Sequence, residues 1–234
     1  RCRQMLELSC DMQAAVSEPD DAPRGLVRLS VSTSFGQAQL AEAMADYVKR
    51  YPLVSIDLQM LDRTVNLVDE RIDLAIRTSN DLDPNLIARQ LTVCRSVICA
   101  SPAYLQEHPQ PQRVEELAGH NCLTHSYFGK SLWHFEEDGE PVSVPVHGNI
   151  SANEASTLLR LTLAGAGVAM LPTYQAGEYI RSGQLIRLLP HAEPRRMNMY
   201  AVYASRKHMP QALRSLLDFL VLRFPPEPQW DVGL

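Results

Sequence analysis

The residues of this chain that are best placed to bind a ligand stand where apolar, strand-like runs end. They are Thr33, Ser34, Phe35, Leu61, Arg77, Ala100, Ser101, His125 and Pro172. Ligands of open parallel sheets settle outside the carboxyl ends of the strands, where helix N-termini present free N–H groups and a partial positive charge. Hydroxyl and amide donors there would suit a carboxylate or another small anion. The guanidinium of Arg77 would bind such an anion through two hydrogen bonds.

The same residues also have structural interpretations that involve no ligand. The hydroxyl groups of residues 32–34 could serve only to cap a helix. Arg77 could pair with Asp81 or Asp83 at the surface. His125 is one of seven histidines and could be structural. The positions therefore give a hypothesis about anion binding and not a defined motif.

No pattern in the sequence predicts catalysis or a resident cofactor. A GxSxG nucleophile with a histidine partner is absent, so we do not expect an enzyme. The five cysteines, at positions 2, 10, 94, 99 and 122, form no CxxC pair and no zinc-like ladder with histidines. We therefore expect no metal and no cofactor. A redox couple of Cys94 and Cys99 is an alternative to reduced, semi-buried thiols, which are favoured.

Composition is that of an ordinary soluble globular protein. Its 234 residues, 45% of them hydrophobic, suffice for one α/β unit or for two small lobes. The net charge of -5 argues against a chain that grips a nucleic-acid backbone unaided. No apolar run approaches the roughly 20 residues of a membrane helix, and the first residues lack the apolar core of a secretory signal. We therefore expect a cytoplasmic protein without a membrane contact.

The first half of the chain predicts a β-α-β-α-β unit. Alternating apolar side chains predict strands at Leu26–Ser32 and Val54–Met60, and a third strand is expected at Asp73–Thr78. Between them, apolar residues at helical spacing predict one helix that ends at Pro52 and a second over Arg63–Arg71. This order implies a parallel sheet with right-handed crossovers.

The second half repeats the alternation of strands and helices. Strands are expected over residues 93–101, 121–125, 132–136, 142–150, 168–171, 185–188 and 199–204. Helices are expected from Pro102, from Asn153 through Ala164, over 174–181 and over 213–224. Asn153 would be either the cap of its helix or a ligand contact. Two similar lobes are the simplest explanation of this repetition.

Three segments, in this order and at matching separations, resemble a known family. They are GLVRLSVSTSFG, DRTVNLVDERIDLAIR continuing to NLIARQL, and AGAGVAMLPTY after the helix that begins at Asn153. Together they resemble the effector-binding domain of LysR-type transcriptional regulators, and the resemblance covers roughly Arg24 to Phe224. Residues 1–16 carry apolar side chains at coiled-coil spacing and resemble the end of that family's linker helix.

The resemblance implies an α/β fold of two Rossmann-like lobes, similar to a type 2 periplasmic binding protein, with a small-molecule effector held between them. The chain would cross between the lobes near Ala100–Pro102 and near Ala204–Arg206. The implied division is linker helix and hinge at 1–24, lobe one at 25–100 and 204–225, lobe two at 101–203, and a C-terminal tail at 226–234.

The resemblance also implies partners. Family members form homodimers, with tetramers expected for some full-length proteins. The helix around Leu40–Tyr51 would pack beside the helix Ser156–Leu163 of the second subunit. A winged helix-turn-helix domain would precede Arg1, so operator DNA would be bound only through that domain. A stand-alone solute-binding protein for a small anion is the alternative, and it is less favoured because residues 1–16 resemble a linker helix.

Overall fold

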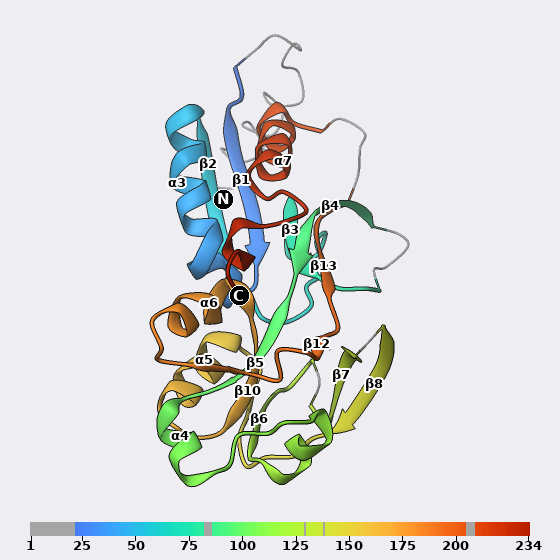
Figure 1. Ribbon diagram of the computed structural model, residues 1–234. Coiled ribbons are helices and arrows are strands. Elements are labelled where there is room, and N and C mark those ends of the chain that lie inside the picture. Colours follow the sequence, from blue (N-terminus) through green and yellow to red (C-terminus); the bar gives the residue numbers. More distant parts are fainter. Residues whose placement is uncertain (1–21, 82–85, 129, 138, 205–208) are drawn as a thin grey trace. The chain divides into compact units, whose positions relative to one another are not determined.

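The structure is a computed structural model that describes residues 22–81, 86–128, 130–137, 139–204 and 209–234 (Figure 1). The predicted linker helix and Asp83, one predicted partner of Arg77, lie outside these residues. The chain divides into two compact units. The first unit holds the described residues up to Ser32, Gln39–Thr92 and Asn198–Pro226. The second holds Thr33–Ala38, Val93–Met197 and Glu227–Leu234.

The first unit is built on a mixed five-stranded sheet. In spatial order its strands are β2 (Val54–Met60), β1 (Gly25–Val31), β3 (Leu74–Thr78), β13 (Met197–Tyr203) and β4 (Ile87–Cys94). β1 runs parallel to β2 and to β3, whereas β13 runs antiparallel to β3. The three strands predicted in the first half of the chain all form, and their parallel pairing is confirmed.

Two helices cover this sheet. α3 (Ala41–Arg50) packs on β2, α7 (Gln211–Arg223) packs on β1, and the two helices contact each other (Figure 1). Tyr47 links them because its hydroxyl donates to the Ala212 carbonyl (3.1 Å) and lies 2.7 Å from the Ser215 hydroxyl. α3 continues a helical segment that starts with α2 (Thr33–Phe35) and a π-helical stretch at Gly36–Leu40.

The prediction of a helix over Arg63–Arg71 is wrong, because the structure has only a single turn there. The Asn66 side chain accepts hydrogen bonds from the N–H groups of Val68 (3.0 Å) and Asp69 (3.2 Å) and so starts the turn. Arg71 has a φ of 53°, a left-handed conformation that a helix cannot continue through. Val65 and Leu67 of this segment still pack into a small core cluster, whereas Val68 is 72% exposed.

The second unit contains two sheets. The larger has the spatial order β11 (Ile186–Leu188), β5 (Ser96–Ala100), β10 (Val168–Pro172), β6 (Cys122–His125) and β9 (Ser151–Ala152). The smaller consists of β12 (Glu193–Pro194), β7 (Leu132–Glu137) and β8 (Glu140–Pro145). The helical elements are α4 (Pro102–Glu107), α5 (Ala155–Leu163), α6 (Thr173–Arg181) and the short 3-10 turns Val114–Gly119 and Gln229–Asp231, the last labelled η3.

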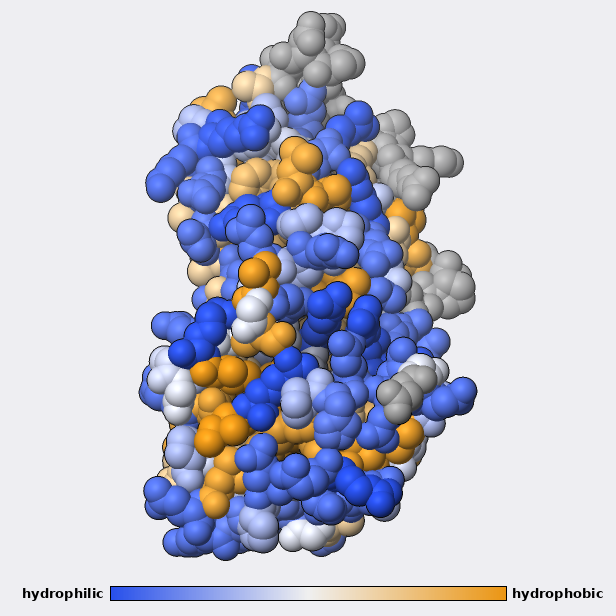
Figure 2. Space-filling view, viewed as in Figure 1, coloured by the Kyte–Doolittle hydropathy of each residue, from blue (hydrophilic) through white to orange (hydrophobic). Residues whose placement is uncertain are grey.

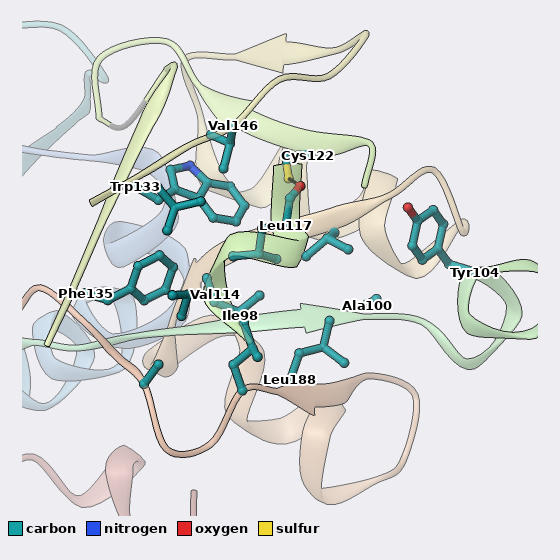
Figure 3. Close-up of a cluster of buried hydrophobic side chains, with 14 residues drawn as sticks. Ile98, Ala100, Tyr104, Val114, Leu117, Cys122, Trp133, Phe135, Val146 and Leu188 are labelled. Atoms are coloured by element: carbon teal, nitrogen blue, oxygen red, sulfur yellow. Dashed lines mark hydrogen bonds between the residues drawn. The ribbon is translucent and has the colours of Figure 1, made fainter. Parts of the chain in front are cut away.

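A core cluster of the second unit joins the hairpin of β7 and β8 to the larger sheet. Trp133 and Phe135 of β7 point toward Val114 and Leu117 (Figure 3). Trp133 is 1% exposed, and full burial of such a side chain stabilises the fold by about 3 kcal/mol. The face in Figure 2 is largely hydrophilic over the described residues, as expected when the core takes up the large apolar side chains.

The chain passes between the units at other places than predicted. β5 belongs to the second sheet, so the chain leaves the first unit between Thr92 and Val93, before the predicted crossing at Ala100–Pro102. β13 belongs to the first sheet, so the chain returns between Met197 and Asn198. Apolar alternation shows that a segment is a strand but not which sheet it joins, because both sheets bury the same residue types.

Candidate functional site

Three strands of the second unit end at one edge of its larger sheet. β6 runs parallel to β10 and to β9, so their carboxyl ends lie together. His125, Asn153 and Pro172 stand at these ends, as predicted from the sequence. α5 and α6 begin directly afterwards, which places two helix N-termini at the same edge. This is the arrangement in which open α/β sheets bind ligands.

Ala100 and Ser101 do not join this group, contrary to the sequence prediction. β5 runs antiparallel to β10, with Ser96 opposite Pro172, so the carboxyl end of β5 lies at the other edge of the sheet. The Ser101 hydroxyl accepts a hydrogen bond from the Tyr104 N–H (3.3 Å) and caps α4. Ser101 is thus a helix cap.

Ser34 and Tyr174 form a hydroxyl pair at the start of two helices. The Ser34 hydroxyl, from α2, lies 3.1 Å from the Tyr174 hydroxyl, from the first turn of α6. Ser34 is only 4% exposed, and the Phe35 ring packs edge-on against the Tyr174 ring with centroids 5.3 Å apart. Both hydroxyls can donate as well as accept, so the pair can present a donor to an anion. The neighbouring Thr33 is partly exposed.

The π-helical stretch Gly36–Leu40 follows this pair directly. Such stretches are uncommon and often occur at functional sites, because the widened turn shifts the side chains on either side of it. Here it separates α2, which carries Ser34, from the regular helix α3.

Gln175 brings a buried amide to the same place. Gln175 is 8% exposed, and its Nε2 donates to the Ser156 hydroxyl at 2.8 Å. Its Oε1 is buried and has no hydrogen-bond partner among the described residues. Exchanging the amide nitrogen and oxygen would only move the unmet hydrogen bond to the other atom. A polar group of a ligand or a water molecule is needed to satisfy it.

The N-terminus of α5 is already occupied by a carboxylate. Glu154, not Asn153, is its cap, and its two oxygens accept hydrogen bonds from the N–H groups of Ser156 (2.7 Å) and Thr157 (2.8 Å). Burial alone would raise the pKa of Glu154, but these hydrogen bonds outweigh it and lower the pKa. Asn153 is exposed beside the cap. By contrast, no side chain caps α6, and its first N–H, that of Thr173, donates to the Arg95 carbonyl (3.0 Å).

His125 sits in an aromatic group at the end of β6. Its Nδ1 accepts a hydrogen bond from the Tyr127 N–H at 3.2 Å. The ring centroid of Phe128 lies 5.1 Å from that of His125, and the Tyr127 centroid lies 6.0 Å away. Tyr127 is 58% exposed and Phe128 44%, which is unusual for rings of this size. The position of His125 at the strand end agrees with the prediction.

Arg77 and Leu61 belong to the first unit. The Leu61 N–H donates to the Val31 carbonyl at 2.8 Å, which places Leu61 beside the carboxyl end of β1. Arg77, near the end of β3, donates from Nη2 to the Ser30 hydroxyl (3.2 Å) and from Nη1 to the Ile76 carbonyl (3.3 Å). No carboxylate of the described residues lies within 4.0 Å of it, so a pair with Asp81 is not formed. Burial lowers the Arg77 pKa.

Sequence comparison identifies the family. Residues 20–225 match the family model described as the LysR substrate binding domain. The chain belongs to the LysR substrate-binding domain family. Its two-lobe α/β architecture, expected from the resemblance of three sequence segments, is thereby confirmed.

Known LysR-type regulators match this domain over most of its length. The HTH-type transcriptional activator TtdR of Escherichia coli O6:K15:H31 is 31% identical over 207 residues, which are 88% of this chain and 66% of TtdR. The HTH-type transcriptional regulator DmlR of Escherichia coli K12 is 32% identical over 89% of this chain and 68% of its own. The chain therefore spans about two thirds of the length of these relatives. None of these matches favours a stand-alone solute-binding protein.

Solved structures show the same fold. The regulatory domain of CrgA, a LysR-type transcriptional regulator from Neisseria meningitidis, superposes with a TM-score of 0.77. It is 30% identical to this chain, and the match covers 87% of this chain and 100% of the CrgA domain. The relatives named above are transcriptional regulators, and none of their names describes an enzyme.

Two polar residues of the LysR-family domain, Tyr174 and Gln175, were not among those predicted from the sequence to contact a ligand. Tyr174 and Gln175 follow Pro172, a predicted strand end, and the polar sequence TYQ after that proline was the available signal. Among the described residues, no three His, Cys, Asp or Glu side chains are grouped to hold a metal ion. None of the described helices is long and apolar enough to cross a membrane.

Proposed function

We propose that this chain is the effector-binding domain of a LysR-type transcriptional regulator and that it senses a small carboxylate. The hydroxyl pair of Ser34 and Tyr174 carries the proposal. One hydroxyl of the pair donates to the other, which leaves one O–H to donate to a ligand beside the start of α6, where a carboxylate would accept a charge-assisted hydrogen bond. The buried Oε1 of Gln175, next in sequence, would accept a hydrogen bond from a donor of the same ligand.

In this proposal other parts of the regulator carry the effect of ligand binding from this domain to DNA. Operator DNA would be contacted by an N-terminal winged helix-turn-helix domain, because a chain with a net charge of -5 has no basic footprint of its own. The regulator would act in the cytoplasm as a homodimer or larger oligomer. Effector binding would shift the population of conformations, and the subunits would pass that shift to the DNA-binding domains.

The first experiment is a thermal-shift screen with succinate, citrate, benzoate and salicylate. A ligand at one hundred times its Kd stabilises the native state by about 2.7 kcal/mol, which such a screen detects. We expect at least one carboxylate to raise the melting temperature of the wild-type chain. In Ser34→Ala and Tyr174→Phe its Kd should rise roughly tenfold or more, because each loses a hydrogen bond to a charged group.

Ser143→Ala is the matched control. Ser143 lies in the β7–β8 hairpin of the same unit, where its hydroxyl is 2.8 Å from Nδ1 of His134. The control should keep the wild-type Kd. Equal binding by all three variants would exclude the hydroxyl pair as the site, and silence of every carboxylate would reject the proposed ligand class.

A further inference from the structure

The segment Glu227–Leu234 packs on the second unit although the helix before it belongs to the first. α7 ends at Arg223 in the first unit, and the chain passes to the second unit between Pro226 and Glu227. There η3 packs against α6, the helix that carries Tyr174. The sequence analysis treated these residues as a tail without a role. Their contacts place them at the hydroxyl pair.

Trp230 completes an aromatic cluster with Phe35 and Tyr174. Its ring centroid is 6.1 Å from that of Phe35 and 6.2 Å from that of Tyr174, with interplanar angles of 74° and 83°. Phe35 and Tyr174 are themselves in edge-to-face contact at 78°. All three pairs therefore have the orientation that aromatic quadrupoles favour. Each ring restricts the rotation of the other two.

Asp231 anchors the segment beside the cluster. Its side chain is 9% exposed, and its Oδ2 lies 3.7 Å from Nε of Arg95. The backbone carbonyl of Arg95 accepts hydrogen bonds from the N–H (3.0 Å) and the hydroxyl (3.2 Å) of Thr173, the first residue of α6. The segment is thus connected to the start of α6 on both sides, through Trp230 to Tyr174 and through Asp231 and Arg95 to Thr173.

We propose that Trp230 is a positioning residue of the effector site, an inference that rests on the proposed function of the hydroxyl pair. The Trp230 ring holds the Tyr174 and Phe35 rings, and these fix the separation and direction of the Tyr174 and Ser34 hydroxyls. Without it, Tyr174 can turn to other rotamers, and the donors are no longer arranged for a carboxylate before it binds. Trp230 acts through Tyr174 and does not need to touch the ligand.

Hydrogen exchange tests the positioning role without any ligand. In Trp230→Ala we expect the amides of residues 33–38 and 173–178 to exchange at least about tenfold faster, because their local opening becomes easier. Trp230→Phe keeps an aromatic ring and should restore most of the protection. Val232→Ala is the matched control, since Val232 lies on the same segment and is 73% exposed. The β7–β8 hairpin should exchange at the wild-type rate in all variants.

Hydrogen exchange in Trp230→Ala either supports or overturns the positioning role of Trp230. Unchanged exchange in Trp230→Ala overturns the proposal, and so does faster exchange throughout the second unit, because that is general destabilisation. If Trp230→Ala does not unfold cooperatively, Trp230→Leu is held to the same criteria, since it keeps bulk but lacks the ring.

Ligand binding separates this inference from the proposed function. For a carboxylate that binds the wild-type chain, Kd should rise roughly tenfold in Trp230→Ala and return to within about threefold of wild type in Trp230→Phe. A Kd that Ser34→Ala raises but Trp230→Ala leaves unchanged would overturn the positioning role and keep the site. Silence of every carboxylate would reject the proposed function, and the exchange result would still decide whether Trp230 orders Ser34 and Tyr174.

Discussion

Arg77 shows what a single residue reveals about function. Its guanidinium is partly buried, and its hydrogen bonds go to a hydroxyl and a carbonyl, not to a carboxylate of the described residues. The nearby Glu70 is held by Arg63, with Nη–Oε distances of 2.6 and 2.8 Å. Glu70 still attracts the Arg77 charge at a distance, but burial is the larger effect and lowers the Arg77 pKa, so the charged guanidinium is held at a cost in free energy. A residue kept at such a cost fits a role in ligand binding better than a role in stability.

This reasoning predicts that removing Arg77 stabilises the ligand-free chain. In a Ser30→Ala background, where no hydroxyl is left unpaired, Arg77→Met should raise the free energy of unfolding by about 1 kcal/mol. This gain in free energy of unfolding is at the low end of what removal of a buried charge gives, because Arg77 is partly exposed. Urea unfolding measures it. Arg89→Met is the control, since Arg89 is exposed and paired with Asp218 at 2.7 Å, and a loss of stability at Arg77 would contradict the argument.

At the scale of the element, sequence patterns predicted many of the strands but missed β4 (Ile87–Cys94), and they predicted strand directions correctly only for β1, β2 and β3. β2 forms over Val54–Met60, as its alternation predicts, and β1 forms within one residue of its predicted bounds. The direction of β5 depends on its pairing with β10, which is remote in sequence, so the placement of Ala100 and Ser101 was wrong. The helix predicted over Arg63–Arg71 does not form, because the turn that Asn66 starts cannot continue through the left-handed conformation of Arg71, with a φ of 53°.

The cap of α5 gives a prediction at this scale. Glu154→Ala should lower the free energy of unfolding by about 1 kcal/mol at pH 7, because two N–H groups lose their acceptor. The pKa of Glu154 is lowered from its usual 4.5, so its stabilisation is complete above pH 4.5 and is lost as the pH falls through the lowered pKa. The free energies of unfolding of wild type and variant, measured in urea, should therefore converge as the pH falls below 4.5.

Asn153→Ala provides the matched comparison for this cap. The sequence left Asn153 as either the cap or a ligand contact, but Asn153 is exposed and the cap hydrogen bonds go to Glu154. We expect its substitution to change stability by less than about 0.5 kcal/mol at either pH. A larger loss from Asn153→Ala than from Glu154→Ala would show that the capping assignment is wrong.

For the whole molecule, the two-lobe architecture was predictable and the path of the chain was not. Repetition of strands and helices predicts two lobes, because each sheet needs its own covering helices. The segment Glu227–Leu234 carries few apolar residues in a recognisable period, so only the structure shows that Trp230 joins Phe35 and Tyr174. Contacts between residues so far apart in the chain leave no local signal in one sequence.

The thiols report on the second unit as a whole, because Cys94, Cys99 and Cys122 all belong to it. Burial raises the pKa of each to about 12, with a further contribution from Asp231 at Cys94. At pH 8 about one such thiol in ten thousand is ionised, against about a tenth of thiols with the ordinary pKa of 9.0.

In a Cys2→Ser/Cys10→Ser variant, a disulfide reagent such as DTNB should therefore modify no thiol of the native chain within minutes. It should modify three in strong denaturant, and at intermediate denaturant the three should react together as the second unit unfolds. Rapid reaction of one thiol in native conditions would contradict its burial and would reopen the redox pair that the sequence left as an alternative.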